Sequence, residues 1–126
     1  MRCVILDSSA VFHVRDLSIL LSLGEKLYVT EHVLREIRDP RARALIELLR
    51  PEVMHVDQRE IERLMREAPG LSEADCSILV CVDRVRELGK CDEIIVLTDD
   101  ALLRRYLRKR GVKVVSIYFG RMRTNS

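Results

Sequence analysis

Apolar residues along the chain follow two alternating patterns. Five short runs are almost wholly apolar, which is typical of strands buried on both faces of a sheet. Between them lie stretches with apolar residues every three or four positions, as in amphipathic helices. The five runs are Arg2–Leu6, Leu27–Val29, Val53–Val56, Glu93–Leu97 and Val112–Ile117. This alternation predicts an α/β fold, specifically a three-layer α/β/α sandwich around a central parallel five-stranded sheet.

Capping and terminating residues set the expected helix boundaries. A first helix is predicted from about Ala10 to Leu23, with Gly24 ending it. Thr30 and Ser72 are predicted N-caps, and Ser72 begins the longest helix, which ends at Gly89. The other helices are expected from Pro40 to Pro51, around Ile61 to Ala68, and between Thr98 and Gly111.

Length and composition describe a single domain over residues 1–126. The chain is 33% charged and 48% hydrophobic, which is typical of a globular protein rather than a disordered one. No apolar run approaches the ~20 residues of a membrane helix. The N-terminal apolar run reaches Asp7 too early for a signal peptide. We therefore expect a cytoplasmic protein without a membrane segment.

Four cysteines and three histidines do not form a recognisable zinc pattern. No Cys-x-x-Cys pair occurs and the histidines are scattered, so a structural zinc site is not expected. Cys3, Cys76 and Cys81 lie in apolar contexts and are predicted to be small core residues. A disulfide remains open as an alternative.

Acidic residues follow two of the predicted strands. Asp7 comes directly after the first strand, and Asp99 and Asp100 follow the fourth. Ligands of open parallel sheets bind at this carboxyl edge. Glu36 and Asp75 lie in helices beside positions that must be buried, so we expect them near the same edge. Helix capping, or a solvated helix face for Glu36, is the alternative explanation for each acid taken singly.

Several carboxylates in one place would repel one another by about 3 kcal/mol for each pair ~5 Å apart at an effective dielectric of 20. A divalent cation removes this repulsion, and an all-oxygen ligand set favours Mg²⁺ or Mn²⁺. Such a cation activates water and stabilises charge on a phosphodiester. Ser9 and Thr98 are placed to hold the carboxylates, although ordinary helix capping also explains them.

These residues together resemble the PIN-domain family of Mg²⁺- or Mn²⁺-dependent nucleases that cleave single-stranded RNA. The similar segments cover almost the whole chain: residues 4–10 (VILDSSA), 33–37 (VLREI), 71–75 (LSEAD) and 97–100 (LTDD). The resemblance implies that Asp7, Glu36, Asp75 and Asp100 form a catalytic acidic quartet. It implies cation binding by Asp7, Asp75, Asp99 and Asp100, with Asp100 favoured over Asp99 as the fourth acid.

Within the family, the chain is most similar to the archaeal and eukaryotic endonucleases that trim the 3′ end of small-subunit ribosomal RNA. The zinc ribbon of that branch is missing after Arg123, so the chain is expected to be a stand-alone or excised PIN domain. A toxin ribonuclease, which is usually a homodimer and pairs with an antitoxin, is one alternative. A non-catalytic RNA- or protein-binding scaffold is another, and a phosphoacceptor signalling domain fits the acids less well.

Basic residues dominate the C-terminal part of the chain. Residues 101–126 contain eight Lys and Arg residues and no acid, which suits a polyanionic partner or, alternatively, a solvated basic helix. Phosphate contacts to RNA are expected from Arg104, Arg105, Arg108 and Arg110. Partners considered are thus single-stranded RNA, a ribosomal precursor, an antitoxin or a second copy of the chain.

Overall fold

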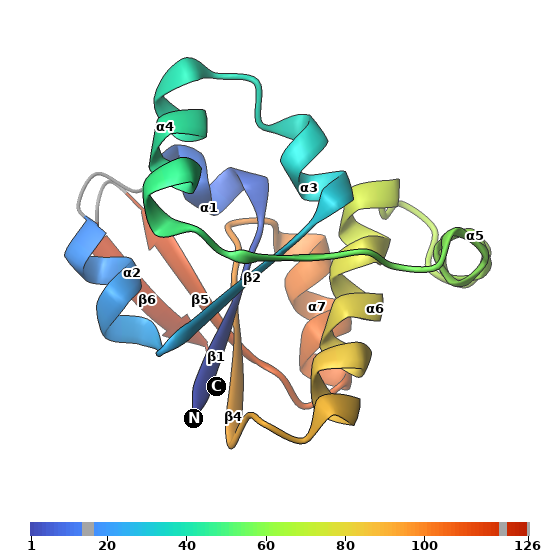
Figure 1. Ribbon diagram of the computed structural model, residues 1–126. Coiled ribbons are helices and arrows are strands. Elements are labelled where there is room, and N and C mark those ends of the chain that lie inside the picture. Colours follow the sequence, from blue (N-terminus) through green and yellow to red (C-terminus); the bar gives the residue numbers. More distant parts are fainter. Residues whose placement is uncertain (14–16, 119–120, 126) are drawn as a thin grey trace.

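A computed structural model describes residues 1–13, 17–118 and 121–125 of the chain. Its strands form one sheet in the order β3-β2-β1-β4-β5-β6 (Figure 1). The first five strands in the chain are mutually parallel, which confirms the predicted parallel five-stranded sheet. The strands are β1 (Arg2–Leu6), β2 (Lys26–Thr30), β3 (Glu52–Met54), β4 (Glu93–Leu97), β5 (Lys113–Tyr118) and β6 (Arg121–Asn125).

The sixth strand was not predicted. β6 pairs antiparallel with β5, from Tyr118 opposite Arg121 to Val114 opposite Asn125. Its sequence, Arg-Met-Arg-Thr-Asn, has one apolar residue and therefore none of the periodicity that indicates a strand. Backbone hydrogen bonds to the edge of β5 define this strand, and they depend little on side-chain type.

Helices cover both faces of the sheet and complete the three-layer sandwich (Figure 1). The chain runs from β1 through β2 to β3 in one direction, and then crosses back to β4 and β5. Because such crossovers are right-handed, the helices of the two halves lie on opposite faces. The helices are α1 (Ser8–His13), α2 (Leu17–Leu23), α3 (Glu31–Glu36), α4 (Pro40–Leu49), α5 (Gln58–Glu67), α6 (Glu73–Leu88) and α7 (Ala101–Lys109).

The predicted caps lie at the ends of the helices they were expected to bound. The Thr30 hydroxyl accepts a hydrogen bond from the Val33 amide at the start of α3, and Ser72 caps α6. Gly89 ends α6 with φ +66°, a conformation that suits glycine. The single helix predicted from Ala10 to Leu23 corresponds to α1 and α2, and residues 14–16 lie outside the described part. No described helix is long and apolar enough to cross a membrane.

The centre of the core is built on β1, whose residues Cys3 to Leu6 are fully buried. Gly24, between α2 and β2, lies directly beside this strand. A Cβ atom at Gly24 would come within 2.7 Å of the Arg2 carbonyl oxygen and 2.9 Å of Val4, so only glycine fits without a shift. The connection between α2 and β2 therefore lies in close contact with β1.

A disulfide joins Cys3 of β1 to Cys91, which lies just before β4. Cys76 and Cys81 are free and buried, as predicted for core residues. Cys3 is also buried, but its bond to Cys91 settles the alternative that the sequence left open. The two cysteines are 88 residues apart, so this bond closes most of the chain into one loop.

Reduction of the Cys3–Cys91 bond is expected to lower the free energy of unfolding by about 4 to 5 kcal/mol, because the unfolded chain regains the entropy of a large loop. Urea unfolding with and without dithiothreitol measures this difference. The variant Cys91→Ser should match the reduced wild type and show no further response to the reductant. An unchanged midpoint on reduction would contradict a stabilising disulfide.

Candidate active site

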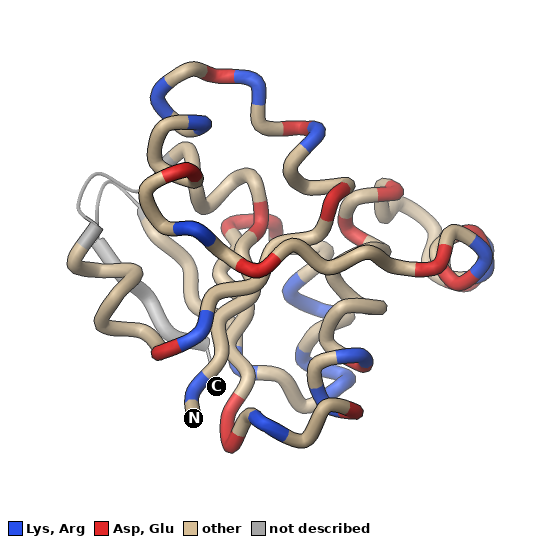
Figure 2. The backbone as a smooth tube through the Cα atoms, in the orientation of Figure 1, with Lys and Arg blue, Asp and Glu red and all other residues tan. Residues whose placement is uncertain are grey.

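The carboxyl ends of β1 and β4 meet at the point where the chain direction across the sheet reverses. Leu6 pairs with Leu97, and the Asp7 amide donates to the Leu97 carbonyl oxygen at 3.0 Å. The segment after β1 therefore lies beside Thr98, Asp99 and Asp100 after β4. Figure 2 shows acidic positions gathered in this central region. This is the usual ligand position of an open parallel sheet.

Asp7 is a buried carboxylate held by three donors. Its side chain is 4% exposed. Oδ2 accepts hydrogen bonds from the hydroxyls of Thr98 at 2.6 Å and Ser9 at 3.0 Å, and Oδ1 accepts from the Ser8 amide at 2.8 Å. Ser9 and Thr98 thus fix the orientation of the Asp7 carboxyl group.

Burial raises the pKa of Asp7 to about 6, because the charged form loses its water. The hydrogen bonds from Thr98, Ser9 and Ser8 act in the opposite direction, and the negative charge of Asp75 adds to the increase. Asp7 is therefore ionised at neutral pH at a cost to the fold, and a positive charge nearby would lower that cost.

Asp75 lies in the first turn of α6 and is half-buried. It completes a capping box: its amide donates to the Ser72 hydroxyl, and its Oδ2 accepts from the Ser72 amide, both at 3.1 Å. Burial raises the pKa of Asp75, and the charge of Asp100 raises it further. Asp75 therefore caps α6 and also interacts with the charges of other acids. Asp75 interacts with the charges of both Asp7 and Asp100.

Asp99 and Asp100 make different contacts although they are adjacent. Oδ1 of Asp99 accepts from the Ile117 amide of β5 at 2.8 Å. Oδ1 of Asp100 accepts from the Leu103 amide at 2.8 Å and so caps α7. The electrostatic contact with Asp75 belongs to Asp100.

Glu36 is at the rim of this group, at the end of α3. It is exposed, and its Oε1 accepts a hydrogen bond from the Ser8 hydroxyl at 3.3 Å. The Ser8 amide binds Asp7, so Ser8 links the rim acid to the buried one. The structure thus brings acids from the starts of α1, α6 and α7 and from the end of α3 to the same edge of the sheet.

A polar network beneath Thr98 was missed from sequence. The Ser116 hydroxyl donates to the Thr98 carbonyl oxygen at 2.8 Å, and Arg104 Nη2 donates to Ser116 Oγ at 2.6 Å. The only signal in the sequence is a serine within the apolar run Val112–Ile117. This network supports the backbone of the loop that carries Asp99 and Asp100.

The four arginines predicted to bind RNA are in different environments. Arg104 contacts Ser116, and Arg110 binds both carboxylate oxygens of Asp83, at 2.9 and 3.1 Å. Arg105 and Arg108 are exposed on α7. Because α7 begins at Asp100, Arg110 lies at the far end of the helix, about 15 Å along its axis.

The donor chemistry of the acidic group fits a hard divalent cation. Asp7, Asp75 and Asp100 offer only oxygen atoms as ligands. Burial and neighbouring negative charge raise the pKa values of Asp7 and Asp75, and a cation would lower them. No three acidic, histidine or cysteine side chains within the described residues already form a closed set of ligands. The carboxylates of Asp7, Asp75 and Asp100 thus interact electrostatically, but their oxygen atoms do not converge on a single point.

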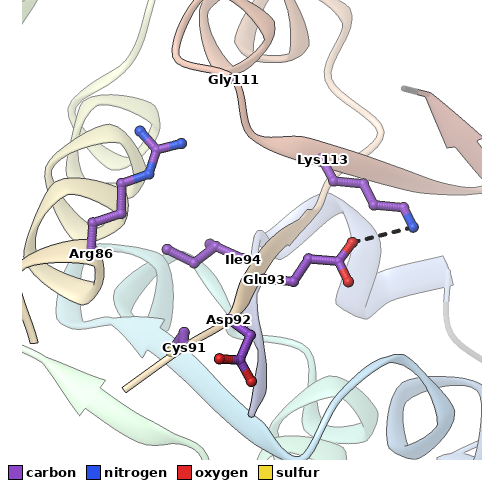
Figure 3. A pocket seen from close by; sticks show the side chains of 7 residues that line it. All are labelled: Arg86, Cys91, Asp92, Glu93, Ile94, Gly111 and Lys113. Atoms are coloured by element: carbon purple, nitrogen blue, oxygen red, sulfur yellow. Dashed lines mark ion pairs between the residues drawn. The ribbon is translucent and has the colours of Figure 1, made fainter. Parts of the chain in front are cut away.

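A pocket of about 310 Å³ lies at the opposite edge of the sheet and has no connection with the acids (Figure 3). Its charged side chains are largely neutralised: Glu93 pairs with Lys113 at 3.4 Å, and Asp92 binds the N-terminal ammonium group. Arg86 donates to the Arg110 carbonyl oxygen at 2.7 Å. This pocket offers paired charges and no group of acids.

Comparison with known proteins identifies the family of the chain. A family model described as a PIN domain matches residues 3–118, which include all five acids. A comparison with curated proteins gave no match. PIN domains are typically Mg²⁺- or Mn²⁺-dependent nucleases, most often ribonucleases. The chain belongs to the PIN-domain family.

Proposed function

We propose that the chain is a Mg²⁺- or Mn²⁺-dependent endoribonuclease that hydrolyses phosphodiester bonds of single-stranded RNA. The observation that carries this proposal is the buried Asp7 carboxylate, with its raised pKa, beside the charges of Asp75 and Asp100 at the switch point of the sheet. A buried acid coupled to other acids at a ligand-binding edge is more typical of a functional site than of a structural one.

Each acid has a proposed role. Asp7, Asp75, Asp99 and Asp100 hold the cation, and Glu36 completes the catalytic quartet with Asp7, Asp75 and Asp100 from the rim. A divalent cation in this place lowers the pKa of water and offsets negative charge that develops on a phosphodiester oxygen. Ser9 and Thr98 position the Asp7 carboxylate through their hydrogen bonds.

Proton transfer is the chemical task proposed for the carboxylates themselves. An ordinary aspartate is a weak base at neutral pH, and a carboxylate whose pKa is raised by burial and by neighbouring charge is a stronger one. Asp75 has such a pKa, is half-buried, and keeps its Oδ1 outside the capping box with Ser72. It is therefore suited to accept a proton from an attacking water molecule.

Processing of ribosomal or other RNA is the cellular role that we propose first. A toxin ribonuclease is the second candidate, and exposed apolar residues favour it. Phe12 on α1 is 48% exposed and Leu21 on α2 is 65% exposed, whereas Val11 and Leu20 are buried. A second copy of the chain or an antitoxin would cover these two side chains.

The variant Asp75→Asn is expected to lose at least ~100-fold in the rate of RNA cleavage, since it removes one charge of the acidic group and its capacity to take up a proton. Asparagine retains an oxygen for the capping box, so the fold should persist. Cleavage of a labelled single-stranded RNA in Mg²⁺ or Mn²⁺ measures the loss.

Asp83→Asn is the matched control, because it makes the same chemical change two turns further along α6, where the side chain pairs with Arg110. It should cleave at nearly the wild-type rate. Equal cleavage by wild type and Asp75→Asn would contradict the enzyme and favour a non-catalytic scaffold.

Stabilisation by Mn²⁺ should depend on pH. Without a cation, the stability contributed by Asp7 is fully present below pH 4 and is lost as pH rises through its folded pKa of about 6. Added Mn²⁺ should therefore raise the melting temperature by about 4 °C or more at pH 8, where Asp7 is ionised, and by much less at pH 5.

Asp7→Asn is the control for this measurement. The amide has no charge to neutralise, so the difference between pH 8 and pH 5 in the response to Mn²⁺ should largely disappear. A Mn²⁺ effect that is the same at both pH values in wild type, or absent from both, would count against cation binding at Asp7.

A further inference from the structure

Three arginines follow the rim acid Glu36 along the chain. We define the arginine arm as Arg38, Arg41 and Arg43, which lie between α3 and α4 and in the first turns of α4. All three side chains are exposed, and none makes an ion pair or side-chain hydrogen bond with another described residue. Asp39 is the single acid among them, so the arm has an excess of positive charge.

The arginine arm lies beside the acidic group. Arg38 is two residues from Glu36, so their Cα atoms are at most about 7 Å apart. Glu36 in turn accepts the hydrogen bond from Ser8, next to Asp7. Helix α1, which begins at Ser8, packs against both α3 and α4. Figure 2 shows Lys or Arg positions recurring along the chain from α3 into α4, at the top of the view.

We propose that the arginine arm binds the phosphates of an RNA strand on one side of the bond to be cleaved. This inference rests on the proposed function and names the surface that holds its substrate. The acids repel a polyanion, so a strand approaching them needs compensating positive charge close by. On α7, by contrast, Arg104 and Arg110 already contact Ser116 and Asp83, and Arg108 lies two turns or more beyond Asp100. Arg105 is the one exposed arginine of α7 within two turns of Asp100, whereas the arm offers three exposed arginines.

The chemistry of the arm indicates contacts to the backbone rather than to bases. Residues 31–50, which span α3, the connection and α4, contain no Phe, Tyr or Trp on which a base could stack. Guanidinium groups bind phosphate oxygens in pairs and release counterions from the nucleic acid. The arm is therefore expected to bind strands of different sequence with similar affinity and with a strong dependence on salt.

The test measures binding alone, in EDTA, so that no cleavage occurs. Fluorescence anisotropy with a labelled 15-nucleotide oligouridylate, at 50 to 200 mM salt, gives the Kd of wild type and of the triple variant Arg38→Gln, Arg41→Gln, Arg43→Gln. We expect binding at least ~10-fold weaker, and a slope of log affinity against log salt that is smaller by about 2 for three lost contacts.

The matched control carries the same loss of three charges on α5. Arg59, Arg63 and Arg66 are exposed, and α5 extends from the opposite side of α6 (Figure 1). Their triple replacement by glutamine should change Kd by less than ~2-fold. Equal weakening by both variants, no weakening by the arm variant, or no RNA binding by wild type would each overturn the proposal.

The outcome is separable from that of the proposed function. Cleavage by wild type with unchanged binding by the arm variant overturns the arm and leaves the enzyme standing. Binding that depends on the arm in a protein without nuclease activity supports the arm and contradicts the enzyme. Circular dichroism of each variant verifies the fold, and Ala42 and Ile46, the buried residues of α4, are unchanged in all of them.

Discussion

The Asp7 carboxylate, with 4% exposure at the end of β1, is the charged group around which the polar contacts of this edge are arranged. The rise in the pKa of Asp7 from 3.8 to about 6 corresponds to a cost on the order of 3 kcal/mol for keeping it charged at neutral pH. Thr98, Ser9 and the Ser8 amide offset part of the loss of water. Asp75 and Asp100 add charge of the same sign nearby. A cost of this size is a substantial part of the net stability of a domain, which is on the order of 5–15 kcal/mol.

The topology explains why these side chains are brought together. The strands β1 and β4 are neighbours in the sheet although they are about ninety residues apart in sequence, and the chain leaves them in opposite directions. Thr98 can therefore donate to Asp7 across the junction, and α6 can present Asp75 to the same place. The Ser116 and Arg104 network supports this junction from β5 and α7.

Much of this arrangement could be predicted from sequence because local signals determine it. The apolar runs gave the five parallel strands, and Thr30, Ser72 and Gly89 marked helix ends through their intrinsic conformational preferences. The placement of Asp7, Asp99 and Asp100 at one edge followed from the rule for parallel sheets. The catalytic roles of Asp7, Glu36, Asp75 and Asp100 and the cation-binding role of Asp99 remain predictions.

Contacts between distant residues could not be predicted in the same way. The polar strand β6 has no apolar period, and its identity comes from pairing with β5. The pairing of Arg110 with Asp83, 27 residues away, depends on how α6 lies against the chain after α7. The bond between Cys3 and Cys91 depends on strand order, which composition does not encode.

That covalent bond has a consequence for the opposite end of the same two strands. The disulfide joins Cys3, near the beginning of β1, to Cys91, just before β4. Asp7 and Thr98 follow the opposite ends of these two strands. A slip of one residue between the two strands would move the hydroxyl some 3.3 Å from its carboxylate. The crosslink therefore adds a covalent restraint to the backbone pairing that keeps β1 and β4 in register and so keeps Thr98 opposite Asp7.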